Sequence, residues 1–321
     1  EETPEEPVVE GEGEPAEPLA ASDPFIGTSG DDMLIGSAGA DLIMGFGGVD
    51  HIVAGAGADV VRAGAGNDFV DGGAGRDVIF GEGGDDDLFG GDDDDIVYGD
   101  AGNDRIFGGN GNDLLNGGAG DDIVFGGAGD DVIVAELNDG DDTYYGDDAS
   151  GGSGIDLLDM GMLTVDATVD LGNGVGGRGS AMSTQTGSDT LWHIENVVTG
   201  SGNDVIIASA SVNVMDGGAG DDLFVFLSAA AADGDTIRNF EPGDKIDLSG
   251  IDADTGAAGN QAFTLVAGSE ATAPGQLVVT HETREDGEYT VISGNTGCDE
   301  TPEFRINIAG NHTLSASDFT L

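Results

Sequence analysis

A nine-residue unit is repeated twelve times, without insertion or deletion, over residues 27–134 of this 321-residue chain. Its pattern is G-x-x-G-x-D-x-U-x, in which U is an aliphatic residue. The sixth column is Asp in every unit: Asp32, Asp41, Asp50, Asp59, Asp68, Asp77, Asp86, Asp95, Asp104, Asp113, Asp122 and Asp131. The eighth column is aliphatic in every unit, from Leu34 to Ile133. A carboxylate and an aliphatic side chain at one fixed spacing predict a stack of similar coils in which each unit forms half a turn.

The charge of the chain is as unusual as its period. It has 64 Asp plus Glu against 8 Lys plus Arg, a formal net charge of −56. Nucleic acids and anionic membranes are polyanions, so this charge excludes both as partners. The twelve units alone hold 23 acidic residues and three arginines, which leaves a charge of −20 that about ten divalent cations would neutralise. We therefore expect bound cations to be needed before the chain becomes compact.

The spacing of glycine and Asp within the unit favours calcium. Glycines in columns one, two and four permit positive φ angles and let carbonyl oxygens approach a common centre. Calcium takes six to eight hard oxygens, more than one loop supplies, so each ion must lie between two loops on the same side of the stack. With two units per coil, twelve units leave five gaps on each side, or about ten calcium ions. The aliphatic column then faces inward, between two sheets of short parallel strands.

The composition divides the chain into five expected segments. Residues 1–22 form an acidic Pro/Glu-rich linker, because they lack the apolar residues of a core. Residues 23–159 form the main stack, which ends in two degenerate units with Asp142 and Asp156 in column six. Residues 160–198 form intervening strands, and residues 199–226 form a second short block with Asp204, Asn213 and Asp222 in column six. Residues 227–321 carry ordinary strand signals at 263–266, 276–280, 289–292 and 304–308.

The repeat resembles that of the RTX, or haemolysin-type calcium-binding, family, which implies an all-β, right-handed parallel β-roll. It also implies that carbonyl groups of columns two and four join the Asp of one loop, while carbonyls of columns one and three join the Asp of the next. One ion would then lie between Gly109, Gly111, Asp113 and Gly126, Ala128, Asp131, and another between Asp100, Gly102, Asp104 and Gly117, Ala119, Asp122. Several columns depart from the pattern: Ala54 and Ala63 in column one, Asp93 in column four, and Thr28, Ser37, Phe46, Glu82 and Asp100 in column two. The early coils and the coil with Asp93 are therefore the weakest matches.

The C-terminal part resembles that of the serralysin-type metalloproteases and their non-enzymatic relatives. The run at residues 235–249 matches D-x-I-x-x-F-x-x-G-D-x-I-D-L-S, and residues 194–197 and 317–321 fit as well. The resemblance implies that residues 227–321 cap the roll and carry an uncleaved signal for type I secretion.

Motifs of catalysis are missing from the sequence. None of its four histidines belongs to H-E-x-x-H, which removes the catalytic zinc site of a serralysin, and G-x-S-x-G is absent as well. Residues 172–177 satisfy G-x-G-x-x-G, but no helix pattern follows them. The single cysteine, Cys298, cannot form an intramolecular disulfide, and no apolar run of membrane-spanning length occurs.

Two functions remain open. The first is a secreted, extracellular calcium-binding β-roll protein that leaves the cell through a type I exporter and folds on binding calcium outside. The alternative is the non-catalytic C-terminal module of a larger secreted enzyme, such as a protease, lipase or polysaccharide epimerase, which the Pro/Glu linker and the absence of an initiator methionine at Glu1 favour. An adhesive or ice-binding face would require a Thr or Asn ladder, and column seven has none. The sequence names no extracellular target.

Overall fold

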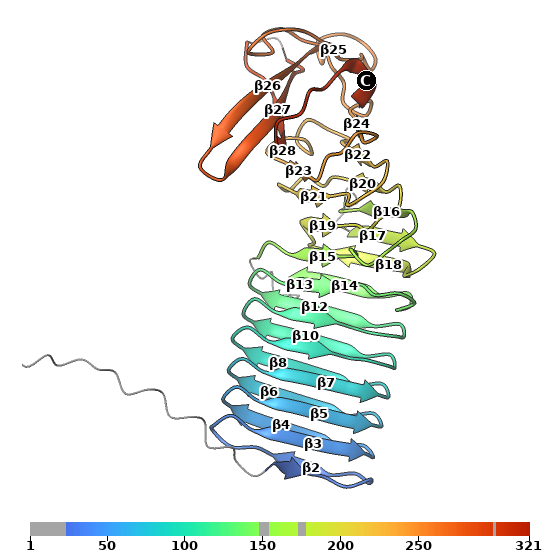
Figure 1. The fold of residues 1–321 in the computed structure, drawn as a ribbon, viewed down its shortest axis with the longest axis vertical. Coiled ribbons are helices and arrows are strands. Elements are labelled where there is room, and N and C mark those ends of the chain that lie inside the picture. Colours follow the sequence, from blue (N-terminus) through green and yellow to red (C-terminus); the bar gives the residue numbers. More distant parts are fainter. Residues whose placement is uncertain (1–23, 148–153, 173–177, 298–299) are drawn as a thin grey trace, which may run out of the picture.

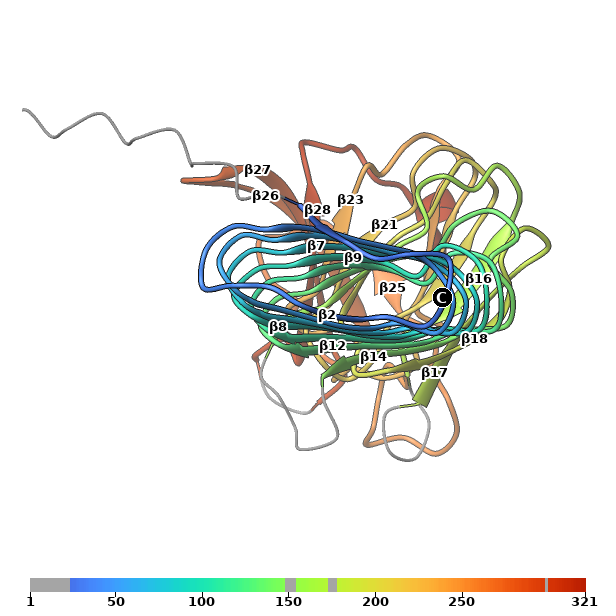
Figure 2. The same ribbon diagram turned by 90° about the horizontal axis from the view of Figure 1, so that it is seen from below.

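The computed structural model describes residues 24–147, 154–172, 178–297 and 300–321. The expected linker at residues 1–22 and Cys298 lie outside the described residues. The chain forms a long stack of flattened coils, with a hairpin-containing segment at the C-terminal end (Figure 1). Seen along the stack, the coils superimpose as a narrow oval whose two long sides are the two sheets (Figure 2). The predicted parallel β-roll is confirmed.

Two sheets run the length of the molecule. The first contains, in spatial order, β1 (Phe25–Ile26), β3 (Leu42–Gly47), β5 (Val60–Ala65), β7 (Val78–Gly83), β9 (Ile96–Tyr98), β11 (Leu114–Asn116), β13 (Val132–Val134), β15 (Leu157–Asp159), β19 (Asn196–Val198), β21 (Val214–Asp216), β23 (Thr236–Arg238), β28 (Phe304–Ala309), β27 (Gly287–Asn295), β26 (Gln276–Arg284) and β25 (Thr264–Leu265). The second contains β2 (Met33–Ile35), β4 (His51–Ala56), β6 (Phe69–Ala74), β8 (Asp87–Asp92), β10 (Arg105–Asn110), β12 (Ile123–Ala128), β14 (Thr143–Asp147), β18 (Gly187–Trp192), β17 (Arg178–Ser183), β16 (Ala167–Asp170), β20 (Val205–Ile207), β22 (Leu223–Val225), β24 (Lys245–Asp247) and β29 (Phe319–Thr320). A 3₁₀ turn, η1 (Ala316–Asp318), precedes β29.

The nonapeptide sets the strand register. Each strand of the repeats pairs in parallel with the strand two units away, so Ile106 lies opposite Val124 and Leu115 opposite Ile133. These partners are 18 residues apart, which confirms that one coil contains two units. Within the segment expected to hold intervening strands, β16 has one buried and one exposed face: Ala167 and Val169 are buried and Thr168 is exposed.

A single row of side chains from each sheet makes the core. The column-eight residues from Ile43 to Ile133 are all fully buried, as their alternation within the unit predicts. The row continues beyond the repeats through Tyr144, Leu158, Leu191 and Val197, and Phe25 packs against its first members. Because one residue per unit fills the interior, the core is thin in relation to the length of the chain.

Aromatic side chains form an outer row on the second sheet, on the face turned away from the core. Successive ring centroids of Phe89, Phe107, Phe125, Tyr145 and Trp192 are 4.7, 4.9, 4.5 and 6.1 Å apart, with nearly parallel planes. The rings stack on one another, so their faces are covered and only their edges meet solvent. Each such pair adds about 0.5–1.5 kcal/mol beyond burial, and the row therefore supports the stack more than it offers a binding surface.

The coil after the repeats contains an excursion. β14 pairs with β18, whose residues lie 47 positions later, so that Tyr144 is opposite Leu191. The antiparallel strands β16, β17 and β18 occupy the intervening positions of the sheet, after which parallel pairing resumes at β20. At the C-terminal end, β27 pairs antiparallel with both β26 and β28, and β28 joins the first sheet beside β23.

Candidate metal centre

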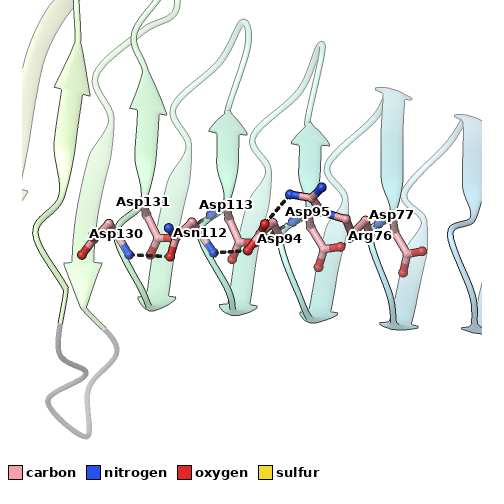
Figure 3. Close-up of polar contacts among 8 residues, drawn as sticks. All are labelled: Arg76, Asp77, Asp94, Asp95, Asn112, Asp113, Asp130 and Asp131. Carbon is pink, nitrogen blue, oxygen red and sulfur yellow. Dashed lines mark hydrogen bonds and ion pairs between the residues drawn. The ribbon is translucent and has the colours of Figure 1, made fainter.

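The column-six aspartates form a continuous hydrogen-bond ladder at each edge of the roll. The backbone N–H of Asp113 donates to Oδ1 of Asp131, one coil later, at 2.8 Å. The same bond joins Asp77 to Asp95 and Asp95 to Asp113 at 2.8 Å each (Figure 3). On the opposite edge, Asp104 N–H donates to Asp122 Oδ1 at 2.7 Å. Each carboxylate is therefore fixed in orientation by the coil before it.

The second oxygen of these carboxylates is buried without a partner. Oδ2 has no hydrogen bond in Asp50, Asp59, Asp68, Asp77, Asp86, Asp95, Asp104, Asp113, Asp122 and Asp131. These residues are almost fully buried, Asp131 being 1% exposed. An ionised oxygen in such a place is strongly destabilising unless a cation or a proton neutralises it.

Main-chain carbonyl groups lie beside the free oxygens. A Cβ built on Gly90, in column one, would lie 2.5 Å from Asp95 Oδ2 and 2.6 Å from the carbonyl oxygen of Gly108 in the next coil. At Gly72 the corresponding distances are 2.7 Å to Asp77 Oδ2 and 2.6 Å to Gly90 O. The column-one glycine thus leaves open a small space that a carboxylate and a carbonyl oxygen of successive coils both border. Hard, partly anionic oxygens of this kind fit calcium.

Column two decides whether the Asp oxygen stays free. From unit three onward the column-two residues adopt positive φ, including the non-glycine residues Phe46, Glu82 and Asp100 at φ 76, 71 and 70. Thr28 and Ser37 do not, and their backbone N–H groups donate to Oδ2 of Asp32 and Asp41 at 2.6 Å each. A left-handed residue at this position therefore turns the N–H away from the carboxylate. Holding non-glycine residues there costs about 1–3 kcal/mol each.

The two predicted ligand sets lie in stacked loops, as follows from the register. Asp113 and Asp131 are joined by the ladder, and Gly109 and Gly111 lie in the loop before Gly126 and Ala128. The carbonyl of Ala128 accepts the N–H of Gly111 at 2.8 Å, and that of Ala119 accepts the N–H of Gly102 at 2.9 Å. The carbonyl of Asp100 accepts the N–H of Ala119 at 2.7 Å. Each of these carbonyls keeps one lone pair for an ion.

The ladder continues into the degenerate units. Asp122 N–H donates to Asp142 Oδ1 at 2.7 Å, Asp131 N–H to Asp156 Oδ1 at 2.9 Å, and Asp204 N–H to Asp222 Oδ1 at 2.9 Å. Four further carboxylates that column counting missed extend it: Asp189 accepts from Asp142, Glu195 from Asp156, Asp235 from Asn213, and Asp244 from Asp222. Spacings of 47, 39 and 22 residues hide them from a nine-residue period, although the T-x-x-G-S-D run at residues 184–189 retains a trace of it.

A second ladder, in column five, runs along the outside of each edge. Asn112 N–H donates to Asp94 Oδ1 at 3.0 Å, and Asp130 N–H donates to Asn112 Oδ1 at 3.0 Å, while Arg76 forms an ion pair with Asp94 (Figure 3). Here the later coil donates to the earlier one, the reverse of the inner ladder. The sequence analysis missed this row, whose signal is a polar residue recurring every 18 positions.

Burial raises the pKa of the column-six carboxyl groups. It raises the pKa of Asp104, Asp122 and Asp131 to about 7 and that of Asp86 to about 8, in each case against the opposing effect of a backbone hydrogen bond from the preceding coil. Neighbouring carboxylates raise these values further. In the absence of a cation, protons are therefore the available means of neutralising the row.

Main-chain oxygens must supply most ligands of any ion in the described coils. Among the residues that the structure describes, no three His, Cys, Asp or Glu side chains come together to hold a metal. A calcium site with one or two carboxylates and several carbonyls agrees with this, whereas a zinc-type site made of side chains alone does not.

Fold and site together define a protein of the calcium-binding β-roll class. Residues 26–61, 62–97 and 98–133 match the RTX calcium-binding nonapeptide repeat, and residues 149–321, more than half of the chain, match the peptidase M10 serralysin C-terminal family. The chain belongs to the serralysin C-terminal family and carries calcium-binding RTX repeats. The resemblance seen in the sequence is confirmed.

Other comparisons add little. Among solved structures, the chain is similar to the solution structure of the AlgE6R3 subunit from the Azotobacter vinelandii mannuronan C5-epimerase, with 16% identity, 95% of this chain and 86% of that chain covered, and a TM-score of 0.17. Among curated proteins, none matches this chain. Within the described ranges, no helix has both the length and the apolar character needed to cross a membrane.

The first prediction compares two neighbouring acids of one loop. Asp131→Asn keeps the Oδ1 acceptor but removes the charge of the buried oxygen, so it should raise the calcium concentration at the folding midpoint about tenfold. Asp130→Asn makes the same charge change in the outer ladder, where Asp130 Oδ1 accepts from Ile155 N–H, and should shift the midpoint less than about twofold. Calcium titrations followed by circular dichroism measure both, and equal midpoints would contradict the assignment of column six to the ion.

The second prediction concerns pH in calcium-free protein. The folded state binds more protons than the unfolded state between the usual Asp pKa and the raised values near 7. Folding without calcium is therefore favoured at low pH and disfavoured as pH rises through 7. Calcium-depleted protein should gain β-structure by circular dichroism on moving from pH 8 to pH 5.5. A loss of β-structure over this range would show that the carboxylates remain ionised.

Proposed function

We propose that this chain is a secreted calcium-binding module that folds when it meets extracellular calcium after export through a type I secretion system. The observation that carries the proposal is the row of buried Oδ2 atoms without a partner. Seven of them lie beside a main-chain carbonyl of the next coil, across a column-one glycine, in a chain of net charge −56: those of Asp50, Asp77, Asp86, Asp95, Asp104, Asp113 and Asp131. In the described repeats no cationic side chain neutralises this row, because the ion pairs of Arg62, Arg76 and Arg105 lie on the outside of the roll.

The geometry supports about ten calcium ions in the main roll. Thr28 and Ser37 occupy the free oxygen of the first Asp on each edge, so the first gaps lack a ligand. Later gaps on one edge run from Asp50 to Asp142, and those on the other run from Asp59 to Asp156. Five gaps on each edge therefore begin at an Asp with an available oxygen, the same number that the charge of the repeats requires. At Asp59 and Asp68, however, column one holds Ala54 and Ala63 in place of the glycine that leaves room beside the oxygen elsewhere.

Because its folding is coupled to calcium binding, the module folds only outside the cell. Ion binding adds its free energy to folding, because the unfolded chain holds no preformed site. In a cytosol with little free calcium, repulsion among the aspartates keeps the chain extended and suited to export. Outside, calcium neutralises the column and the coils stack. We assign residues 227–321 to capping the roll and to recognition by the exporter, and residues 1–22 to a linker.

The alternative function is that of a non-catalytic C-terminal module in a larger secreted enzyme. The match of residues 149–321 to a family named for the C-terminal part of a peptidase favours it. In both cases we propose that the chain itself binds calcium and catalyses no reaction. The coding region before Glu1 distinguishes the two, since an upstream catalytic domain would place this chain in the second class.

The third prediction is that calcium switches the fold on. Calcium-free protein at pH 8 should have the far-ultraviolet circular dichroism of a coil, and millimolar calcium should produce β-structure and a smaller hydrodynamic radius. Magnesium should not substitute, because its small octahedral shell does not suit sites built largely of carbonyls. Complete β-structure in the chelated sample at pH 8 would refute calcium-dependent folding.

The fourth prediction separates the C-terminal segment from the repeats. Deleting residues 227–321 should abolish export by a type I system and raise the calcium midpoint, because the last coils lose the strands β23, β24 and β28 that cover them. A control that deletes residues 54–71 removes one whole coil in register and should be exported normally. Secretion assays and calcium titrations of both variants test this, and export of the protein without residues 227–321 would place the signal elsewhere.

A further inference from the structure

One gap in the stack differs from all the repeats around it. It lies between the unit at residues 137–145 and the unit at residues 184–192, which β14 and β18 join. The loops are also in register: Asn138 N–H donates to Gln185 O at 2.5 Å, and Ser188 N–H to Asp141 Oδ1 at 2.9 Å. All these partners are 47 residues apart, so Asp139 and Thr186, both in column three, lie one above the other.

Column three is buried in this gap and in none of the twelve regular units. The regular units hold small or polar residues there, of which Ala101, Asn110 and Ala119 are exposed and Ala56 and Ala128 are half-buried. Asp139 is instead 2% exposed and Thr186 1% exposed. Both carboxylate oxygens of Asp139 and the hydroxyl of Thr186 are buried without a hydrogen bond of good geometry, as is Oδ2 of Asp189. Backbone groups of Glu136, Asp139 and Gly140 lie near the Asp139 carboxylate and offset only part of the rise that burial causes in its pKa. Four polar oxygens thus lie unpartnered in one gap.

A tyrosine explains why this gap needs its own ligands. Tyr144 replaces the aliphatic residue of column eight, and its hydroxyl donates to Asp142 Oδ2 at 2.7 Å. In a regular unit this oxygen is the free one, so Asp142 has lost the ligand that its column supplies elsewhere. Asp139 brings a second carboxylate into the same coil. Its charge stays unneutralised by any ion pair of the described residues.

We propose that this gap binds a calcium ion through the side chains of Asp139, Thr186 and Asp189, together with loop carbonyls. The proposal rests on the proposed function, because it takes calcium as the ion. The Asp139 carboxylate belongs to this gap alone, whereas each column-six Asp serves the ladder on both sides of it. The added charge makes this site tighter than a repeat site, since ligand charge sets calcium affinity. The ion fastens the coil after the excursion, residues 184–192, to the end of the repeat stack.

The aromatic residues around the gap provide a selective measurement. Terbium(III) takes calcium sites and emits when a nearby tyrosine or tryptophan is excited. Tyr144 contacts Asp142 directly, and the ring of Trp192 stacks on Tyr145 with centroids 6.1 Å apart. Terbium should therefore report this gap, and the gaps beside Tyr98 of β9, in the full-length protein before it reports the other gaps of the repeats.

The experiment titrates terbium into the calcium-free full-length protein and three variants. Asp139→Asn should weaken the sensitised binding on the order of tenfold. Asp141→Asn, in the same loop but with an exposed carboxylate that accepts from Ser188 N–H, is the matched control and should stay within about twofold of wild type. Thr186→Val should also weaken binding. If Thr186 is not a ligand, the same substitution should not weaken terbium binding, because replacing an unpartnered buried hydroxyl with a methyl group stabilises the fold or leaves its stability unchanged.

The outcomes separate this site from the function as a whole. Unchanged terbium affinity in Asp139→Asn, or tighter binding in Thr186→Val, would overturn the proposed site even where calcium still folds the wild-type protein. Failure of calcium to fold the wild-type protein would instead overturn the proposed function. A variant Asp139→Asn that folds in saturating calcium, with circular dichroism equal to wild type but a lost high-affinity terbium phase, supports the site.

Discussion

The two oxygens of each column-six aspartate play different parts, and the rest of the structure depends on this difference. One oxygen accepts the backbone N–H of the preceding coil, as in Asp113 to Asp131, and so fixes the carboxylate at the edge of the roll. The other is then forced into a buried place where no hydrogen-bond donor reaches it. The hydrogen bond that orders the coil therefore also leaves a buried negative charge without a partner. The stack is incomplete until a cation or a proton neutralises that charge.

The backbone conformation of column two keeps that charge available. Thr28 and Ser37 show the alternative, in which the column-two N–H turns to the carboxylate and satisfies it without an ion. Glu82 and Asp100 hold the left-handed conformation at some cost in free energy, although neither is glycine. The thin core offsets such costs only in part, since each unit fully buries only one large apolar side chain. In the function proposed above, ion binding supplies the remaining stabilisation.

The nine-residue period made the repeats predictable from the sequence. Where the period is lost, the carboxylates that continue the ladder could not be predicted. An invariant Asp and an aliphatic residue, each recurring every nine residues, predicted the two sheets, the core row and the Asp column from Asp32 to Asp131, but not the hydrogen bonds that join its members. Asp142 and Asp156 could still be found, because the unit of Asp142 kept the column-four glycine, Gly140, and the unit of Asp156 kept its glycines and the aliphatic Leu158. Asp189 and Glu195 could not, because insertion of the antiparallel strands β16 and β17 separates them from their partners by 47 and 39 residues. Their place in the ladder is set by the sheet and not by local sequence.

Of the two ladders, the inner one changes where the stack is interrupted and the outer one continues. In the inner ladder the earlier coil donates the hydrogen bond, and in the outer ladder the later coil donates it. Each coil is therefore both donor and acceptor toward each of its two neighbours. Beyond Asp189 this arrangement changes: Ala167 occupies the column-six position and can only donate, to Asp204 Oδ1 at 2.7 Å, while Asp166 still accepts from Asn203 N–H at 2.9 Å. The inner ladder therefore restarts at Ala167 without a carboxylate of its own. Two stacks of buried carboxylates meet at this excursion, and the side chains of Asp139 and Thr186 lie on the side of it where the longer stack ends.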